Sequence, residues 1–246
     1  MAGPHITVVD DASDLDRRAA ALIASTIRSR ADASIVAATG SSPIGAYRLL
    51  ARHARTGLDV GHVRVFQLDE YLGVGSGDDR SLFEWMMRDL VSPLGISRDR
   101  VVRLDASGHD PTRACREYDG AVCAAGGFDL AILGLGLNGH LGFNEPPSDP
   151  TSATRVVRLS RESSESNRPY WGGRAVPDRA MTAGLSSLLA ARRVIVVVSG
   201  ASKRDILART LREPPTPWVP ASFLQQHADA HIVVDRAAWS ERPRSD

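Results

Sequence analysis

The sequence predicts an α/β fold: a doubly wound, mostly parallel sheet of the Rossmann-like kind, covered by helices on both faces. Short β-rich segments alternate with amphipathic helical patterns along the whole chain, which is typical of this class. Several segments, such as IVAA, LAIL and VIVVV, are apolar almost throughout, as parallel strands covered on both faces are. The length of 246 residues suits one α/β domain, so we expect a single domain over residues 1–246.

The same alternation predicts where the elements lie. We expect strands at His5–Val9, Ser34–Ala38, Val63–Leu68, Phe128–Leu133, Val194–Ser199 and His231–Val234. We expect helices at Asp11–Arg30, Pro43–Ala54, Arg80–Val91, Pro111–Ala125, Arg179–Ala190 and Lys203–Leu211. The first helix shows the pattern, since Asp11 can cap it while Leu15 and Leu22 fall on one face.

One segment, residues 145–177, departs from this rhythm. It has no clear strand pattern and is rich in Pro, Ser, Thr, Asn and Gly. Long irregular segments in compact domains are usually functional. We therefore expect this segment to be a lid over a ligand site.

Composition excludes several classes of partner. The 30 Lys and Arg residues balance the 29 Asp and Glu residues, giving a net charge of +1, which offers no general attraction for nucleic acids or membranes. No apolar run approaches the ~20 residues that cross a bilayer, and the N-terminal segment lacks a signal-peptide pattern. Cys115 and Cys123 have neither zinc nor disulfide-framework spacing. We expect a cytoplasmic protein with no nucleic-acid or membrane partner.

The first polar cluster, Thr39-Gly40-Ser41-Ser42, follows a predicted buried strand and precedes a helix. Gly40 permits a tight turn, Ser42 can cap the helix, and Pro43 suits its first position. Free N–H groups and three hydroxyls would form a cradle for an anion such as phosphate. The alternative is a capped helix start that binds nothing.

Two adjacent carboxylates, Asp69 and Glu70, follow another predicted strand. Neighbouring residues on a strand point to opposite faces, so they do not form a glycosidase-like pair. One of them could face a crevice as a base while the other is held in the scaffold. The alternative is two solvated loop acids.

The richest segment is GLGLNGHLGFNEP, residues 134–146. It contains G-x-G-x-x-G after a strand, but prolines and the lack of an apolar stripe exclude the helix that a dinucleotide-binding motif needs. It presents Asn138, His140 and Glu145 within eight positions. A histidine between a carboxamide and a carboxylate suits proton transfer. A structural or merely exposed histidine is the alternative.

Two cations lie late in the chain. Arg168 falls within residues 145–177, and Lys203 begins a predicted helix. The helix dipole disfavours a lysine at that end, so we expect an anion near Lys203. For each cation a solvated surface charge is the alternative. No cluster of His, Cys, Asp and Glu has metal-ligand spacing, so we expect no metal site.

The segments together resemble a known family. ATGSSP, FQLDEYLG, LGLNGHLGFNEP, ESNR, AMTAGL, SGASK and PASFLQQH, in this order and at these intervals, are similar to the glucosamine-6-phosphate deaminase/isomerase family. The resemblance runs from about Thr39 to Ala237, and LDEYLG and NGHLGFNEP are its most specific parts. It implies the conversion of glucosamine 6-phosphate into fructose 6-phosphate and ammonia.

The resemblance also implies a role for each matching residue. Asp69 would move a proton between C2 and C1 of the sugar, and His140, flanked by Asn138 and Glu145, would open the ring at O5. The residues that would hold the 6-phosphate are Thr39, Gly40, Ser41, Ser42, Arg168 and Lys203. Residues 145–177 would be the active-site lid, and neither an organic cofactor nor a metal is implied.

Two other functions stay open at this point. Lactone hydrolases of the 6-phosphogluconolactonase type share the architecture and a Gly-His loop, and a non-catalytic sugar-phosphate sensor would need the cradle alone. Allosteric family members bind a second sugar phosphate between subunits. Arg155 matches one of their cations, but Val157 stands where they have lysine, so we expect no such activation. The sequence leaves open the choice between glucosamine and galactosamine phosphates, and whether the chain forms a homo-oligomer.

Overall fold

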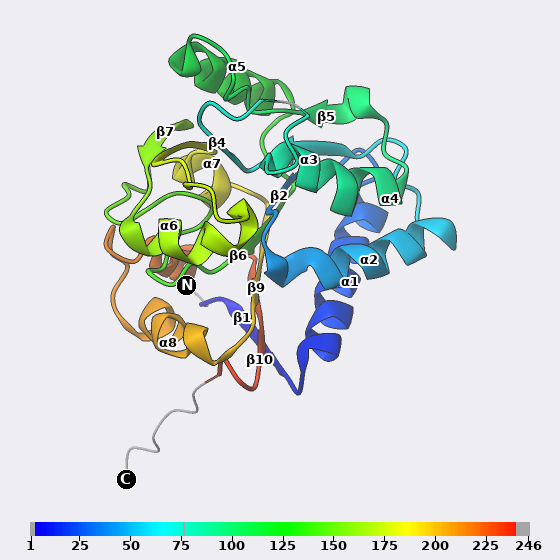
Figure 1. The fold of residues 1–246 in the computed structure, drawn as a ribbon. Helices are drawn as coiled ribbons and strands as arrows, with labels where there is room; N and C mark the ends of the chain where they lie inside the picture. Colours follow the sequence, from blue (N-terminus) through cyan, green and yellow to red (C-terminus); the bar gives the residue numbers. More distant parts are fainter. Residues whose placement is uncertain (1–2, 76, 240–246) are drawn as a thin grey trace.

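The computed structural model describes residues 3–75 and 77–239, and a seven-stranded parallel sheet runs through its centre (Figure 1). The strand order is β1-β10-β9-β6-β2-β3-β5. The strands are β1 (His5–Val9), β2 (Ser34–Ala37), β3 (Arg64–Gln67), β5 (Val101–Val102), β6 (Leu130–Gly134), β9 (Arg193–Val198) and β10 (Ala230–Asp235). The predicted α/β class with a parallel sheet is confirmed.

Strand β9 shows why these segments are apolar throughout. Successive side chains alternate between the two faces of a sheet. Val194, Val196 and Val198 enter the hydrophobic core on one face, while Ile195 and Val197 enter the core on the other. Because both faces are covered, a polar residue at any of these positions would lose its hydration without gaining a partner.

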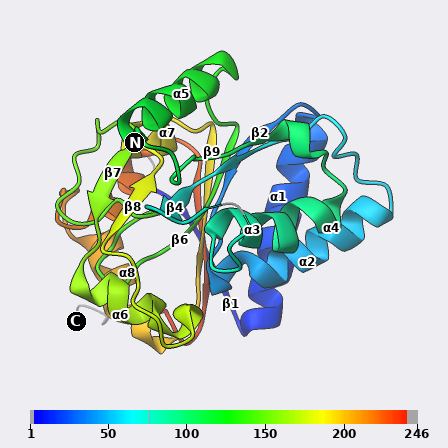
Figure 2. The same ribbon diagram turned by 45° about the horizontal axis from the view of Figure 1, so that its top comes forward.

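Helices cover both faces of the sheet, in two groups (Figure 2). On one face lie α1 (Ala12–Ser29), α2 (Ser41–Arg55), α3 (Leu82–Met86) and α4 (Ser92–Leu94), with a π-helical segment (Met87–Val91) between α3 and α4. On the other face lie α5 (Pro111–Ala124), α7 (Leu185–Leu189) and α8 (Arg204–Arg212). Short 3-10 turns lie at Arg98–Arg100, Arg168–Trp171, Ala201–Lys203 and Pro220–Gln226. In the described residues, no helix is long and apolar enough to span a membrane.

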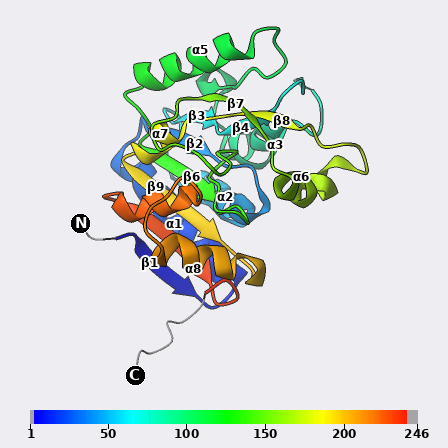
Figure 3. The same cartoon turned by 90° about the vertical axis from the view of Figure 1, so that its left-hand side faces the viewer.

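A second, antiparallel sheet has the order β4-β8-β7 and lies beside the central one (Figure 3). Its strands are β4 (Asp69–Tyr71), β7 (Arg155–Arg158) and β8 (Arg179–Thr182). Asp69 pairs with Thr182, and Arg155 pairs with Thr182 from the other side. The small sheet therefore connects the residues after β3 to the segment expected to be a lid.

The predicted helix Arg179–Ala190 is wrong. Its first four residues form strand β8, and helix α7 begins only at Leu185, after Gly184. A Cβ on Gly184 would lie 2.5 Å from the backbone carbonyl oxygen of Ser152. The chain therefore passes too close to the neighbouring backbone at Gly184 for a side chain there, and the residues before it pair with β4 and β7.

Residues 145–177, which show no clear strand pattern in the sequence, do contain a strand, β7, followed by α6 (Arg161–Asn167). Strand β7 is only half-buried. Its two valines have an arginine on either side, so the sequence shows no apolar run there. Helix α6 begins at Ser160, whose hydroxyl accepts a hydrogen bond from the Ser163 N–H at 3.1 Å.

The order of the strands explains where a ligand can bind. From β2 the chain continues to β3 and β5 on one side, and from β6 it continues to β9 and β10 on the other. Strands β2 and β6 are adjacent and parallel. In doubly wound sheets, ligands bind beyond the carboxyl ends of the strands at such a switch point.

Candidate active site

A cavity of about 700 Å³ lies at this switch point, beyond the carboxyl ends of β2 and β6. Seven of the predicted site residues line it, and they come from four separate segments of the chain. These are Thr39, Gly40, Ser41, Ser42, Asp69, His140 and Lys203. Three other predicted residues, Asn138, Glu145 and Arg168, are not among the lining residues.

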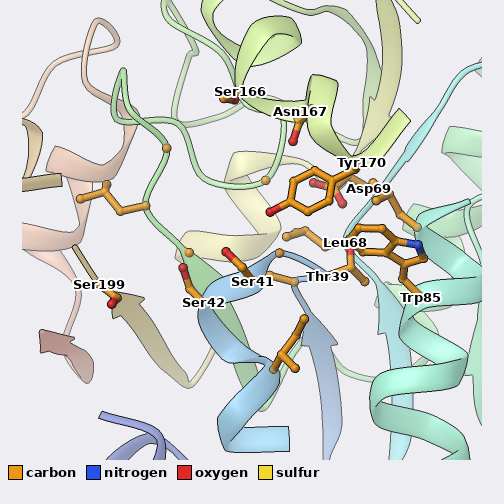
Figure 4. A pocket seen from close by; sticks show the side chains of 18 of the residues that line it. Thr39, Ser41, Ser42, Leu68, Asp69, Trp85, Ser166, Asn167, Tyr170 and Ser199 are labelled. Carbon is orange, nitrogen blue, oxygen red and sulfur yellow. The ribbon is translucent and has the colours of Figure 1, made fainter. Parts of the chain in front are cut away.

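The cradle is built by the start of helix α2. The helix begins at Ser41, two residues before the expected start at Pro43, and Gly40 is its N-cap. Because Gly40 has no side chain and no other side chain caps the helix, the first N–H groups remain available to a ligand. Ser41 and Ser42 lie at this end of α2 beside the cavity (Figure 4). The Tyr47 hydroxyl donates to the Ala38 carbonyl oxygen at 2.8 Å, which fixes α2 against the end of β2.

Strand β4 gives its two carboxylates different environments. Glu70 is fully buried and accepts hydrogen bonds from the Ser81 hydroxyl at 2.6 Å and from the Phe83 N–H at 3.0 Å. Gln67 donates to the same carboxylate at 3.0 Å. Asp69, one residue earlier, is 7% exposed and lines the cavity. Glu70 thus holds the turn between β4 and α3, and Asp69 is available to a ligand.

Burial, with the adjacent Glu70 carboxylate as a second cause, raises the pKa of Asp69 from 3.8 to about 8. A carboxyl group with a pKa near neutrality can take and return a proton at physiological pH. Tyr170 and Trp85 line the same cavity as Asp69 (Figure 4). The surroundings therefore suit Asp69 to general acid–base chemistry.

His140 follows β6, and its ring packs onto the backbone of Gly136. A Cβ on Gly136 would lie 2.4 Å from Nε2 of His140, so only glycine leaves room for the imidazole. Nδ1 of the ring lies 3.6 Å from Oε2 of Glu145 and 3.4 Å from the Ser163 hydroxyl. This leaves Nε2 as the ring nitrogen without a hydrogen-bond partner among the described residues.

Asn138 and Glu145 form a layer behind His140. The Asn138 amide donates to Oε2 of Glu145 at 2.7 Å, and its carbonyl oxygen accepts from the His140 backbone N–H at 3.2 Å. The Ser160 N–H reaches Oε1 of Glu145 at 3.4 Å. Glu145 is thereby tied both to the His140 loop and to the start of α6.

The charge of Glu145 is stabilised in this position. Burial alone raises the pKa of Glu145, but hydrogen bonding and the charge of His140 outweigh it. With further hydrogen bonds from Ser163 and Asn138, the pKa falls to about 2. A permanent carboxylate beside Nδ1 favours a proton on that nitrogen and fixes the orientation of the ring. Nε2 is then the nitrogen that can exchange a proton with a ligand.

Lys203 reaches the cavity from the turn after β9. The Asp235 carboxylate accepts from the Ser199 hydroxyl at 2.5 Å and from the Gly200 N–H at 3.1 Å, which holds this turn. Lys203 is half-buried and is the N-cap of α8. Burial lowers its pKa, and the Glu162 carboxylate of α6 partly offsets the effect.

Arg168 is the predicted cation that the structure does not bring to the cavity. It begins the 3-10 turn after α6 and is exposed. Its charge acts instead on Glu165, whose pKa is lowered mainly by Arg161. Ser166 and Asn167, the two residues before Arg168, do line the cavity.

Sequence reasoning missed several lining residues that arrive from separate elements: Asp16, Arg48, Arg80, Trp85, Tyr170 and Trp171. Two aromatic contacts join the segment after α6 to the rest of the chain. The rings of Trp85 and Tyr170 meet edge to face at 5.1 Å, and Trp171 meets Tyr71 in the same way at 5.0 Å. The aromatic pair Tyr170-Trp171 was a signal in the sequence, but its partners depend on the fold.

Arg155, considered above as a cation of a second site, is used within the chain. Its guanidinium donates to the side-chain amide oxygen (Oδ1) of Asn144 at 2.7 Å and to the Ser148 hydroxyl at 3.0 Å. The Ser148 hydroxyl donates in turn to the Glu145 carbonyl oxygen at 2.6 Å. Arg155 therefore braces the loop that carries Glu145.

Among residues 3–75 and 77–239, no group of three or more His, Cys, Asp or Glu side chains is arranged to hold a metal ion. The cavity instead combines free helix N–H groups, a cation, a buried carboxyl group and a histidine held by a carboxylate. This set can bind an anion at one place and move protons at another.

Comparison with known proteins places this geometry in context. Residues 9–233 match the family described as glucosamine-6-phosphate isomerases/6-phosphogluconolactonase. The chain is 34% identical over 239 residues to glucosamine-6-phosphate deaminase of Clostridium botulinum (strain Kyoto / Type A2), covering 96% of this chain and 98% of the relative. It is 36% identical over 245 residues to glucosamine-6-phosphate deaminase of Streptomyces coelicolor, covering 98% and 94%.

Solved structures agree with these matches. The chain is similar to a monomeric glucosamine-6-phosphate deaminase with a TM-score of 0.91 and 32% identity, over 95% of this chain and 98% of that one. It is also similar to 6-phosphogluconolactonase of Trypanosoma brucei, with a TM-score of 0.78 and 21% identity over 97% and 98%. The second likeness concerns the fold alone.

Proposed function

The chain belongs to the family of glucosamine-6-phosphate isomerases and 6-phosphogluconolactonases, and we propose that it is a glucosamine-6-phosphate deaminase. The relatives that are about a third identical over nearly the whole chain carry that activity in their names. The substrate is a sugar phosphate, and the reaction yields fructose 6-phosphate and ammonia. The lactonases resemble the chain only in fold.

The observation that carries the proposal is one cavity that contains both an anion cradle and two proton-transfer groups. The uncapped start of α2, with Thr39, Ser41 and Ser42, offers N–H and hydroxyl donors to a phosphate. Lys203 adds a positive charge on the wall of the same cavity. A sensor of sugar phosphates would need this half of the site alone, so the buried Asp69 and the His140–Glu145 pair favour catalysis.

The chemistry follows from the position of each group. With its phosphate in the cradle, the sugar places its reducing end toward Asp69 and His140. Nε2 of His140 handles the O5 proton as the ring opens, while Glu145 and Asn138 hold the imidazole. Asp69 then takes the C2 proton and returns it to C1, while O1 gains a proton and the C2 amine loses one, which leaves a hydroxyl at C1 and an imine at C2. Water adds to this imine, and ammonia departs to give the ketose.

Arg168 and the lid belong to the proposal as well. Arg168 is exposed and follows two lining residues, Ser166 and Asn167. The proposal requires that the 3-10 turn moves inward when the sugar phosphate binds, so that the guanidinium contacts the phosphate. We further propose that residues 1–246 act as one domain, since the first and last strands, β1 and β10, pair within the same sheet. Both cysteines are free, which suits the proposed location in the cytoplasm.

The direct test is ammonia release from a panel of amino-sugar 6-phosphates, with 6-phosphogluconolactone as the control substrate. We expect ammonia from glucosamine 6-phosphate and no accelerated hydrolysis of the lactone. Lactone hydrolysis without ammonia release would replace this function with that of a lactonase. Sugar-phosphate binding without any turnover would favour a sensor.

A further inference from the structure

Lys203 is the only lysine in the chain, and the other 29 basic side chains counted as Lys or Arg are arginines. The chain uses arginine wherever it needs a positive charge, including at Arg48 and Arg80 on the cavity wall. A guanidinium does not lose its proton in proteins, whereas an ammonium can become a nucleophilic amine. Lys203 is therefore the cation of the cavity wall that can become a nucleophile.

The surroundings of Lys203 leave its amine available. No hydrogen bond or ion pair involves its ammonium among the residues that the structure describes. The side chain is half-buried, and burial lowers its pKa. Glu162, the charged side chain that opposes this shift, lies on α6 rather than within ion-pair distance. The amine is free for a larger share of the time than that of a surface lysine.

The position of Lys203 determines which ligands it can reach. It follows β9, while the cradle follows β2, and β6 lies between these two strands. Two strand spacings amount to about 10 Å. An extended lysine side chain covers roughly 6 Å of this span, on the basis of standard bond lengths. A group that lies a few atoms from a phosphate in the cradle is therefore within reach of the amine.

We propose that Lys203 and the α2 cradle form a covalent binding site for short phosphorylated aldehydes, which condense with the lysine amine to a reversible imine. The proposal rests on the phosphate site of the proposed function. The nitrogen lone pair attacks the aldehyde carbon, and the C=O electron pair moves to oxygen and takes up a proton. Loss of water from this carbinolamine gives the imine, so that one amine and one aldehyde yield one imine and one water.

The length of the ligand separates this class from the substrate. In glucosamine 6-phosphate the aldehyde forms at C1, at the opposite end of a six-carbon chain from the phosphate. With the phosphate in the cradle, that carbon lies toward Asp69 and away from Lys203. In pyridoxal 5′-phosphate or glyceraldehyde 3-phosphate the aldehyde lies close to the phosphate ester. Such compounds would block the phosphate site and inhibit turnover.

The test uses pyridoxal 5′-phosphate as the probe on the full-length protein, with borohydride to reduce the imine before mass spectrometry. We expect one adduct per chain, on the peptide that contains Lys203, and loss of ammonia release in proportion to its formation. Pyridoxal, which lacks the phosphate, should label Lys203 at least tenfold more weakly, and inorganic phosphate should protect it. In Lys203→Arg, which keeps the charge, this adduct should disappear.

The N-terminal amine provides an internal reference, since it is the other primary amine of the chain. Labelling of that amine alone, or equal labelling by pyridoxal and its phosphate, would overturn the proposal. If Lys203→Arg fails to fold, the wild-type protein still tests the proposal, because inorganic phosphate should protect Lys203 from labelling. Ammonia release by the unlabelled protein is measured in parallel. A labelled Lys203 in a protein without deaminase activity would refute the proposed function and leave this inference standing.

Discussion

Replacing Asp69 by Asn should stabilise the ligand-free protein, and the gain should grow with pH. Asp69 is 7% exposed, and its pKa rises from 3.8 to about 8 on folding. Between about pH 4 and pH 8 the folded state therefore binds a proton that the unfolded chain has lost. Stability falls with rising pH under this condition, by at most ~1.4 kcal/mol per pH unit. Asparagine has a similar shape and no proton to lose, so the variant avoids this cost.

The size of the effect follows from the pH window. Between about pH 5 and pH 7.5 the stability gain of the variant can grow by at most roughly 3 kcal/mol. Local relaxation around a buried charge reduces this growth, so we expect a gain of ~1–3 kcal/mol. Urea unfolding of both proteins at a series of pH values measures the difference directly. Other titrating groups are common to both proteins and cancel in the difference. The same variant should lose turnover by roughly 10²–10⁴-fold, because a carboxamide cannot accept the C2 proton.

Glu145→Gln is the matched control, because its effect on stability should have the opposite sign. The folded-state pKa of Glu145 is lowered from 4.5 to about 2, so its carboxylate contributes stability above about pH 4.5. This contribution disappears as the pH falls toward 2. The variant should therefore be less stable than the wild type at neutral pH. A stability gain of Asp69→Asn that does not change with pH, or a loss that grows with pH, would refute the reasoning about Asp69.

Four further outcomes are expected. Gly136→Ala should lower kcat/KM at least tenfold while folding normally, because a Cβ 2.4 Å from Nε2 displaces the His140 ring; steady-state kinetics and circular dichroism check this. Gly184→Ala should destabilise the protein by roughly 1–3 kcal/mol in urea titrations, since its Cβ meets rigid backbone at 2.5 Å. Lys203→Met should raise KM for the sugar phosphate about tenfold to a hundredfold through loss of a charge-assisted hydrogen bond, and an unchanged KM would remove it from the phosphate site. The kcat/KM of the wild type should fall as the pH drops below about 8, where Asp69 takes up a proton.

The central strands were predictable because burial on both faces leaves a simple signal. A run such as Val194–Val198 has no polar position, since both of its faces contribute to the core. The small sheet was not predictable in this way. Strand β7 is half-buried and has an arginine at each end. Strand β8 is only four residues long, too short for its sequence to show a strand pattern. Both strands depend on pairing with distant residues, which local patterns do not contain.

The residues of the candidate site also differ in whether a local sequence pattern indicates them. Residues in the segments that follow buried strands, such as Asp69 and His140, could be proposed from the sequence because strand ends in this class meet at one edge. Arg48 lies two turns into a helix, and Trp85 and Tyr170 are more than eighty positions apart in the chain. Their shared presence at the cavity follows from how helices pack, and no spacing in the sequence indicates it. Arg168 shows the reverse, since its segment reaches the cavity while its own side chain is exposed.

The measurement that tests the central claim most directly is proton exchange at C1 of fructose 6-phosphate in deuterated water with ammonia present, followed by proton NMR. In the proposed mechanism Asp69 moves the proton between C1 and C2, so the wild type should exchange it and Asp69→Asn should not. In the same mechanism His140 acts on the closed ring, and fructose 6-phosphate opens more readily in solution than glucosamine 6-phosphate. His140→Gln should therefore lose most of its ammonia release and keep much of the exchange. Exchange in Asp69→Asn at the wild-type rate, or none in a wild type that binds the sugar phosphate, would contradict the account.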